Sequence, residues 1–166
     1  MEAIVLAGGL GTRLRAAVPD VPKPMAPVNH RPFLEYQLAY WVKQGVTRFV
    51  VSVGYMHEKV VAHFGASFRG ADIDYAIEAE LLGTGGGLLF AMRRLKSNER
   101  FVVLNGDTYF AVPLNAMIEF TNTKKADLTI AVFPSGDGSR YLGLNIDADG
   151  RIRSPSADSA RGTNWS

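Results

Sequence analysis

The sequence predicts an α/β fold with a doubly wound, mostly parallel sheet that is covered by helices on both faces. Two observations predict it. Short continuous apolar runs alternate along the chain with segments of helical periodicity, and the apolar runs show no polar alternation. Strands that are apolar on both sides belong to sheets buried on both faces, and such sheets are mostly parallel. The chain has 166 residues and is 47% hydrophobic, which is enough for one domain with its own core.

Five apolar runs are the expected strands of this sheet: residues 3–7, 48–53, 73–77, 101–104 and 128–133. Four segments with apolar residues at helical spacing are the expected helices: residues 31–44, 57–64, 87–95 and 114–124. In the first of these helices, Leu34, Leu38 and Trp41 would lie on one side. Ligands of such sheets bind at the carboxyl ends of the strands, so a site is expected in the loops that follow them.

Residues 154–166 are mostly small and polar and show no apolar period, which predicts a disordered tail after a domain of residues 1–153. The formal net charge of +2 arises within residues 151–166, which carry three arginines and one aspartate. The rest of the chain is neutral overall, so the composition does not favour nucleic acid as a partner.

The chain contains no cysteine, which excludes a disulfide framework and a thiolate metal site. The first apolar run is too short for a signal peptide, and no stretch approaches the length of a membrane span. We therefore expect a cytoplasmic protein without a membrane partner.

The first expected strand ends in a glycine-rich loop, VLAGGLGTRL at residues 5–14, and the segment PKPM follows at residues 22–25. Glycines let backbone N–H groups approach an anion closely, and Arg13 and Lys23 would neutralise its charge. A polyphosphate is the natural ligand of such a loop. A plain strand-to-helix turn is the alternative interpretation.

Two better-known glycine loops do not match this segment. No lysine follows a glycine at the spacing of a Walker A loop. The dinucleotide fingerprint begins well at Gly9 and Gly11, but Leu14 occupies its third glycine position. The second expected strand also ends without the usual acidic residue. An NAD-dependent oxidoreductase is therefore disfavoured.

Two further polar clusters follow the third and fourth expected strands. Glu78 and the segment LGTGGG at residues 82–87 follow the third, and NGDT at residues 105–108 follows the fourth. All three clusters should open on one rim of the sheet. The glycine segment suits a flat ring held against backbone, with a flexible hinge as the alternative. Asp107 suits Mg²⁺, with a turn aspartate that binds local backbone as the alternative.

In this combination and order, the motifs resemble those of the sugar-1-phosphate nucleotidyltransferases, over about residues 3–150. Within that family the likeness is greatest to guanylyltransferases of D-glycero-D-manno-heptose 1-phosphate. The resemblance implies transfer of a nucleotidyl group, GMP from GTP, to a sugar 1-phosphate, with release of pyrophosphate and with Mg²⁺ as cofactor. Such a reaction serves the synthesis of nucleotide-activated sugars and surface polysaccharides.

The resemblance also implies a role for each matching residue. Arg13, Lys23 and Asp107 would be catalytic, and Asp107 would hold the metal. Tyr141 and Gly143 would lie beside the sugar. The nucleotide would contact Leu6, Ala7, Gly8, Gly9, Gly11, Thr12, Arg13, Glu78, Gly83, Thr84 and Gly85.

The match ends near the C-terminus of the sequence. Members of the family continue well past the position of Ile152, with a motif for the sugar phosphate and a second metal-binding aspartate. Residues 154–166 match nothing in that pattern, which predicts a chain truncated or altered in frame after about Arg153. A nucleotide-binding relic without turnover is therefore the alternative function. N-acetylmuramate, mannose and glucose 1-phosphates are alternative substrates, and the base and a homo-oligomeric state stay open.

Overall fold

The computed structural model describes residues 1–11, 18–97, 99–132 and 144–155. The chain forms two compact units, Met1–Lys124 and Lys125–Ser166. Among the described residues, no helix combines the length and the apolar character that crossing a bilayer requires.

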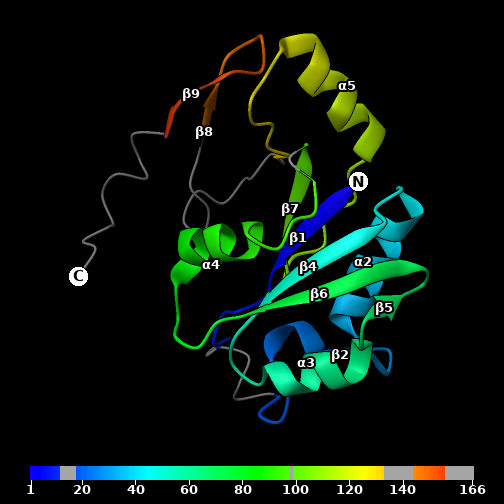
Figure 1. Cartoon of the computed structure of the whole chain (residues 1–166). Helices are drawn as coiled ribbons and strands as arrows, with labels where there is room; N and C mark the ends of the chain where they lie inside the picture. The colour runs from blue at the N-terminus through cyan, green and yellow to red at the C-terminus, as the bar shows by residue number, and fades with distance from the viewer. Residues whose placement is uncertain (12–17, 98, 133–143, 156–166) are drawn as a thin grey trace. The chain divides into compact units, whose positions relative to one another are not determined.

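The first unit is built on a five-stranded sheet with the order β5-β6-β4-β1-β7 (Figure 1). Four of its strands run parallel: β1 (Glu2–Leu6), β4 (Arg48–Val53), β6 (Ala71–Ile77) and β7 (Phe101–Asn105). The short edge strand β5 (Ser67–Phe68) is antiparallel to β6. The predicted α/β class and the mostly parallel sheet are thereby confirmed.

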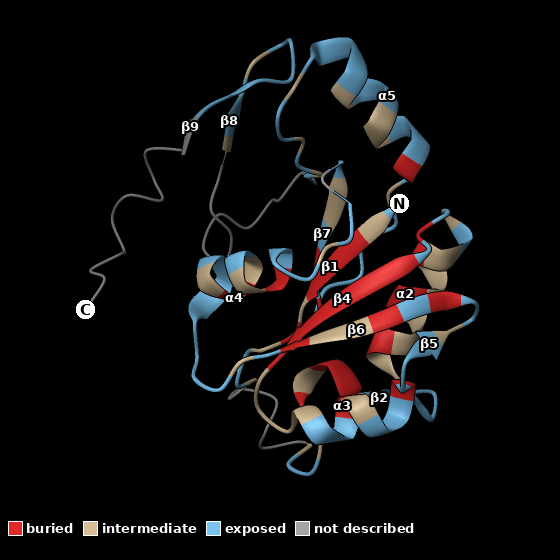
Figure 2. Ribbon diagram, viewed as in Figure 1, coloured by how far each residue is buried: buried red, intermediate tan, exposed pale blue. Residues whose placement is uncertain are grey.

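Alternate residues of each central strand enter two separate cores. In β1, Ala3 and Val5 pack with residues of α2 (Phe33–Lys43) and α3 (His57–Phe64). Ile4 points to the opposite face, where it packs with residues of α4 (Gly83–Met92). Figure 2 shows the buried residues concentrated in β1 and β4, between these helices. This double burial explains the unbroken apolar run of β1, whereas β6, which lies nearer the edge of the sheet, carries the exposed Asp72.

Helix α5 (Leu114–Lys124) completes the first unit, and its first residue is buried in the core on the α2 side of the sheet. The helices α3 and α5 have the predicted bounds. The other two differ from the prediction at their ends.

Helix α2 begins at Phe33 instead of residue 31. The residues before it form a hairpin in which β2 (Pro27–Val28) pairs antiparallel with β3 (Arg31–Pro32). Asn29 and His30 make the turn with φ values of 46° and 63°, the left-handed conformation that two-residue hairpin turns require.

Helix α4 begins at Gly83 instead of residue 87 and ends at Met92. Residues 83–86 of the glycine segment thus form the first turn of the helix. Glycine has low helix propensity, so the sequence pattern favoured a later start. Close packing requires glycine at two of these positions: a Cβ at Gly86 would lie 2.8 Å from the Cβ of Leu82, and a Cβ at Gly87 would lie 2.7 Å from Oε1 of Glu78.

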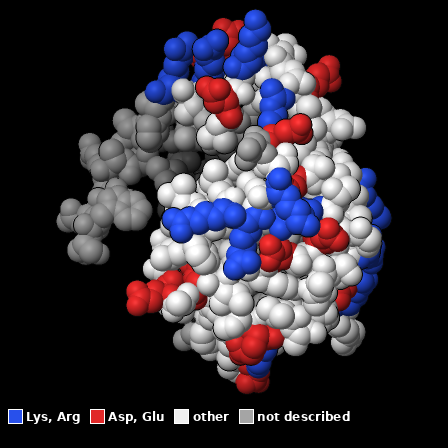
Figure 3. Space-filling model, in the orientation of Figure 1, with Lys and Arg blue, Asp and Glu red and all other residues white. Residues whose placement is uncertain are grey.

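A buried arginine joins three strands of the sheet. Arg48, at the start of β4, has a side chain that is 8% exposed, and it pairs with Glu2 at 2.5 Å and with Asp74 at 2.9 Å. Glu2 also accepts hydrogen bonds from the backbone N–H groups of Lys96 and Ser97. The network ties β1, β4 and β6 to the segment after α4. Figure 3 shows basic and acidic side chains next to one another on one face of the molecule.

In the second unit, β8 (Leu144–Ile146) pairs antiparallel with β9 (Ile152–Pro155). Strand β9 extends two residues past the expected domain boundary at residue 153, and residues 156–166 lie outside the described residues.

The prediction of a strand at residues 128–133 is wrong for residues 128–132, which are the part of this segment that the structure describes. Residues 128–132 are not in a strand, and Leu128 is 75% exposed. An apolar run becomes a strand only where a neighbouring strand receives its hydrogen bonds, which local pattern does not reveal.

Candidate active site

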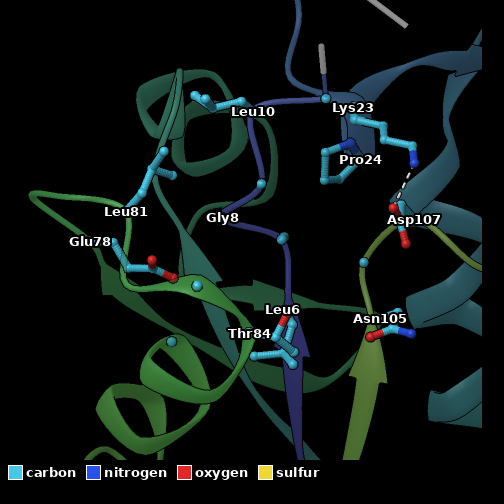
Figure 4. A pocket seen from close by; sticks show the side chains of 16 residues that line it. Leu6, Gly8, Leu10, Lys23, Pro24, Glu78, Leu81, Thr84, Asn105 and Asp107 are labelled. Atoms are coloured by element: carbon cyan, nitrogen blue, oxygen red, sulfur yellow. Dashed lines mark hydrogen bonds and ion pairs between the residues drawn. The ribbon is translucent and has the colours of Figure 1, made fainter. Parts of the chain in front are cut away.

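A cleft of about 810 Å³ opens in the first unit at the carboxyl ends of β1, β6 and β7 (Figure 4). The loops that follow these strands, the short 3₁₀ helix η1 (Lys23–Met25) and the start of α4 form its walls. The lining residues are Leu6, Ala7, Gly8, Gly9, Leu10, Gly11, Lys23, Pro24, Glu78, Leu81, Gly83, Thr84, Gly87, Asn105, Gly106 and Asp107.

Backbone hydrogen bonds fix the floor of the cleft. The N–H of Ala7 donates to the carbonyl of Ser52 at 2.8 Å, and the N–H of Gly106 donates to the carbonyl of Leu6 at 2.7 Å. These bonds extend the sheet ladder beyond the strands on both sides of β1. A Cβ at position 106 would lie 2.8 Å from the Leu6 carbonyl oxygen, so only glycine allows this approach.

Glu78 is held at one end of the cleft. Its Oε1 accepts a hydrogen bond from the buried Ser52 hydroxyl at 2.6 Å, and its Oε2 accepts one from the N–H of Leu82 at 3.2 Å. A Cβ at Gly8 would lie 2.6 Å from Oε1, and a Cβ at Gly87 would lie 2.7 Å from it. The missing side chains at these two positions are therefore what admits the carboxylate between the β1 loop and α4.

The N-terminus of α4 lies beside Glu78. Gly83 and Thr84 line the cleft, and the residue before the helix provides no side-chain cap. Gly83 has a φ of +69°, which glycine adopts without strain. The N–H groups of a first helical turn carry a partial positive charge. This wall of the cleft thus combines an acidic acceptor with backbone donors.

The other end of the cleft holds an ion pair. Lys23 Nζ lies 2.6 Å from Asp107 Oδ2, and the two side chains are 40% and 41% exposed. The Thr108 hydroxyl donates to Asp107 Oδ1 at 3.1 Å. Partial burial acts to raise the pKa of Asp107, but the hydrogen bonds and charge of Lys23 outweigh it and hold that pKa below its ordinary value. Asp107 is therefore ionised at neutral pH.

The donor set at this end suits a metal ion that is shared with a ligand. In the part of the chain that the structure describes, no three His, Cys, Asp or Glu side chains are grouped to hold a metal by themselves. Mg²⁺ is commonly bound by one or two carboxylates together with phosphate oxygens and waters. A single half-exposed carboxylate such as Asp107 fits that mode of binding.

Most of the residues expected from the sequence come together in this cleft. Ten of the nucleotide and metal candidates line it: Leu6, Ala7, Gly8, Gly9, Gly11, Lys23, Glu78, Gly83, Thr84 and Asp107. Gly85 belongs to the same first turn of α4 but is not among the lining residues. Thr12, Arg13, Tyr141 and Gly143 lie outside the described residues.

Sequence reasoning missed several residues of the cleft. Pro24, Asn105 and Gly106 lie inside the motifs already singled out, so the signal for them was present. Ser52 lies in the second expected strand, and its hydrogen bond to Glu78 joins positions 26 residues apart, which no local pattern in the sequence indicates. Leu10 also lies inside one of those motifs, whereas Leu81 is an apolar loop residue that no spacing rule identifies.

Comparisons with known proteins agree with this geometry. The family model for nucleotidyl transferases matches residues 2–154. The chain is 47% identical over 152 residues to D-glycero-alpha-D-manno-heptose 1-phosphate guanylyltransferase of Aneurinibacillus thermoaerophilus, covering 92% of this chain and 65% of that protein. It is 33% identical to mannose-1-phosphate guanylyltransferase of Mycobacterium tuberculosis, covering 92% of this chain and 42% of that protein. The chain thus spans just under two thirds of the heptose relative's length.

Solved structures agree as well. The crystal structure of HddC from Yersinia pseudotuberculosis matches with a TM-score of 0.80 and 35% identity, covering 93% of this chain and 68% of that one. HddC complexed with GMP-PN matches with a TM-score of 0.77. The match to the family model spans nearly the whole described chain, including every segment that lines the cleft. The chain therefore belongs to the nucleotidyl transferase family.

Proposed function

We propose that this chain binds GTP in the cleft and transfers GMP to the phosphate of a sugar 1-phosphate, D-glycero-α-D-manno-heptose 1-phosphate, with release of pyrophosphate. The observation that carries the proposal is the arrangement of the cleft. A carboxylate acceptor and helix N–H donors lie at one end, the glycine loop lies in the middle, and Lys23 and Asp107 lie at the other. This order suits a base, a ribose and a chain of phosphates.

Guanine is the base that the acidic end favours. Its Watson–Crick edge carries two neighbouring N–H donors, whereas the corresponding edge of adenine offers one donor beside an acceptor. Glu78 keeps acceptor capacity beyond its bonds to Ser52 and Leu82, because a carboxylate has about four acceptor positions. Two names among the similar proteins support the same base: those of the heptose and mannose 1-phosphate guanylyltransferases.

The phosphates would lie against the end of the glycine loop at Gly11. Gly11 and Lys23 both line the cleft, and a Cβ at Gly11 would lie 2.9 Å from the Cβ of Lys23, so the positive charge of Lys23 is next to this part of the loop. We assign Thr12 and Arg13, which continue this loop in the sequence, to the same phosphates. Together these groups reduce the repulsion between two anionic substrates.

The reaction needs no nucleophile from the protein. An oxygen of the sugar phosphate attacks the α-phosphorus of GTP in line, and the bond from that phosphorus to the pyrophosphate oxygen breaks. Lys23 and Arg13 would stabilise the charge that develops on pyrophosphate, and Asp107 would hold Mg²⁺. When bound, Mg²⁺ supplies further neutralisation and orients the phosphates. We assign Tyr141 and Gly143 to the sugar.

The similar proteins favour a heptose over mannose as the sugar. Relatives are named for both heptose and mannose 1-phosphate, and the heptose relatives have the higher identities of 47% and 41%. Both substrates are small phosphorylated metabolites, so we propose the cytoplasm as the place of action. Nucleotide binding without transfer is the second candidate function, because the described lining of the cleft carries most of the residues that we assign to the nucleotide.

The test is pyrophosphate release by the 166-residue chain with Mg²⁺, measured over the common nucleoside triphosphates and a panel of sugar 1-phosphates. The panel includes the heptose, mannose, glucose and N-acetylmuramate derivatives. Release that requires both GTP and the heptose phosphate supports the proposal. Tight binding of GTP without release for any sugar supports the second candidate, and preference for another triphosphate overturns the assignment of the base.

A further inference from the structure

We propose that Gln37 is a positioning residue of the active site, because its side-chain amide holds the loop that presents Asp107. Gln37 lies on α2, outside the cleft lining, and is 3% exposed. Its Nε2 donates one hydrogen bond to the carbonyl of Asn105 at 2.7 Å and another to the carbonyl of Thr108 at 3.0 Å. These two carbonyls stand on either side of Asp107 in the chain.

The two bonds close the loop from the α2 side. The loop's own turn bond, from the N–H of Thr108 to the carbonyl of Asn105, is long at 3.4 Å. On the opposite side, the N–H of Gly106 donates to Leu6 of β1 at 2.7 Å. The backbone around Asp107 is therefore anchored to the sheet at one point and to Gln37 at two.

The environment of Gln37 indicates that the amide serves the loop and not the core. Its neighbours along the buried face of α2 are Leu34, Leu38 and Trp41. Among the described residues, Gln37 Oε1 is a buried side-chain oxygen without a hydrogen-bond partner. An unpaired buried oxygen is destabilising, so an apolar side chain of similar length would suit this core better by itself. The two hydrogen bonds that Nε2 donates to the loop compensate for the unpaired oxygen.

The orientation of the amide is set by the same geometry. If its oxygen and nitrogen were exchanged, the oxygen would face two carbonyl oxygens within hydrogen-bonding distance. Only the NH₂ group can satisfy both acceptors. The donor pair at this position is therefore required by the loop.

This inference rests on the proposed role of Asp107 as the metal-holding carboxylate. Replacing Gln37 by Met keeps the length and removes both donors, so the two carbonyls lose their partner and the loop becomes free to shift. We expect binding of Mn²⁺, as a substitute for Mg²⁺, to the complex of protein and GTP to weaken by about 10- to 100-fold. Binding of GTP measured without metal should stay within about 3-fold of the wild-type value, because Gln37 lies outside the cleft lining.

A second glutamine of the same helix region provides the matched control. Gln44 Oε1 accepts a hydrogen bond from the backbone N–H of Leu114 at 3.1 Å, and it does not bond to the loop of Asp107. Gln44→Met should leave Mn²⁺ binding unchanged. Gln37→Glu keeps the size and, with a proton on the carboxyl, one donor, so it should fall between the wild type and Gln37→Met.

Hydrogen exchange of the ligand-free chain gives a readout that is independent of nucleotide and metal. Gln37→Met should speed exchange in the peptide covering residues 105–110 by at least about 10-fold, while Gln44→Met leaves this peptide at the wild-type rate. Equal exchange in wild type and Gln37→Met overturns the inference. Faster exchange that is uniform over α2 and β7 also overturns it, because the substitution would then loosen the fold in general and not the loop of Asp107 in particular.

The two proposals can fail separately. A wild-type chain that binds no GTP overturns the proposed function, and loop exchange still decides the role of Gln37. A wild-type chain that binds GTP with a metal, next to a Gln37→Met variant with unchanged Mn²⁺ binding and unchanged exchange, overturns the role of Gln37 alone. If Gln37→Met does not fold, the same comparison is made with Gln37→Glu.

Discussion

Lys23 and Asp107 form an ion pair of 2.6 Å at one end of the candidate active site, although they are 84 positions apart in the sequence. Both groups have other proposed partners once substrate is bound: the phosphates for Lys23 and the metal ion for Asp107. Because both side chains are partly exposed, the pair contributes little to stability. Its main consequence is that both charges already lie at the phosphate end of the cleft before any ligand binds.

Replacing Lys23 by Met should therefore damage function far more than stability. We expect pyrophosphate release to fall by about 100-fold or more, because a positive charge is lost where negative charge develops. The free energy of unfolding should change by less than about 1 kcal/mol. Lys43→Met, on the last residue of α2 outside the cleft lining, is the control and should leave release unchanged. Comparable losses in the two variants would contradict the role of Lys23.

Glu78→Gln should change the choice of base. The amide presents a donor where guanine also presents donors, so we expect the affinity for GTP to fall by about 10- to 100-fold, as for loss of a hydrogen bond to a charged group. The affinity for ATP should change much less, so the ratio of the two is the quantity to measure. Glu80→Gln, at an exposed position two residues further on, is the matched control. An unchanged ratio in Glu78→Gln would remove Glu78 from base recognition.

Gly106→Ala should disturb the fold and the site together. The new Cβ would lie 2.8 Å from the carbonyl oxygen of Leu6, 2.9 Å from the Cβ of Ala7 and 3.1 Å from the Cα of Ala7, so the backbone at the end of β1 would have to move. We expect a loss of about 1–3 kcal/mol in the free energy of unfolding, as for overpacking, measured by chemical denaturation. Gly85→Ala is the contrast, because nothing lies within 4 Å of the added Cβ and alanine favours a helix. A Gly106→Ala variant as stable as the wild type would contradict this expectation, because the ends of β1 and β7 would then be able to move apart and accommodate the added Cβ.

Acid should destabilise the chain partly through Glu2. Burial acts to raise the pKa of Glu2, but the N–H groups of Ser97 and Lys96 and the charge of Arg48 outweigh it and lower that pKa below 4.5. A carboxyl with a lowered pKa stabilises the fold above its ordinary pKa, and the contribution is lost as the pH falls through the lowered value. The free energy of unfolding should thus fall from about pH 5 downward.

Glu2→Gln tests this contribution, because the amide removes the charge and keeps the size. We expect the variant to be about 1–3 kcal/mol less stable at pH 7 and to lose less stability on acidification than the wild type. Glu58→Gln on the surface of α3 is the control. Parallel curves of stability against pH for wild type and Glu2→Gln would show that Glu2 is not the group responsible.

The sequence was sufficient for the parts of the fold in which local pattern and tertiary structure agree. The strands around Ile4 and Val50 are fully buried, so their unbroken apolar character identified them. Residues 128–132 have a similar apolar character, yet the structure places no strand there, because strand formation depends on a partner. The start of α4 was missed because the glycines within residues 83–86 have low helix propensity.

The site was predictable to a similar extent. Residues that follow strands in recognisable motifs, such as Gly8 and Asp107, were identified because parallel strands bring their carboxyl ends to one rim. Contacts between distant segments were not predictable. The bond from Ser52 to Glu78 and the bonds from Gln37 to the loop of Asp107 depend on the packing of α2, α4 and the sheet, which no local spacing encodes.

The affinity for GTP with and without Mg²⁺, compared between the wild-type chain and Asp107→Asn, tests the central claim most directly. This measurement needs no sugar substrate, and it tests nucleotide binding and metal binding in the same cleft. We predict that Mg²⁺ strengthens GTP binding to the wild type by about 10-fold or more and has little effect on Asp107→Asn. An equal effect of Mg²⁺ on both proteins, or no binding of GTP by the wild type, would contradict the account.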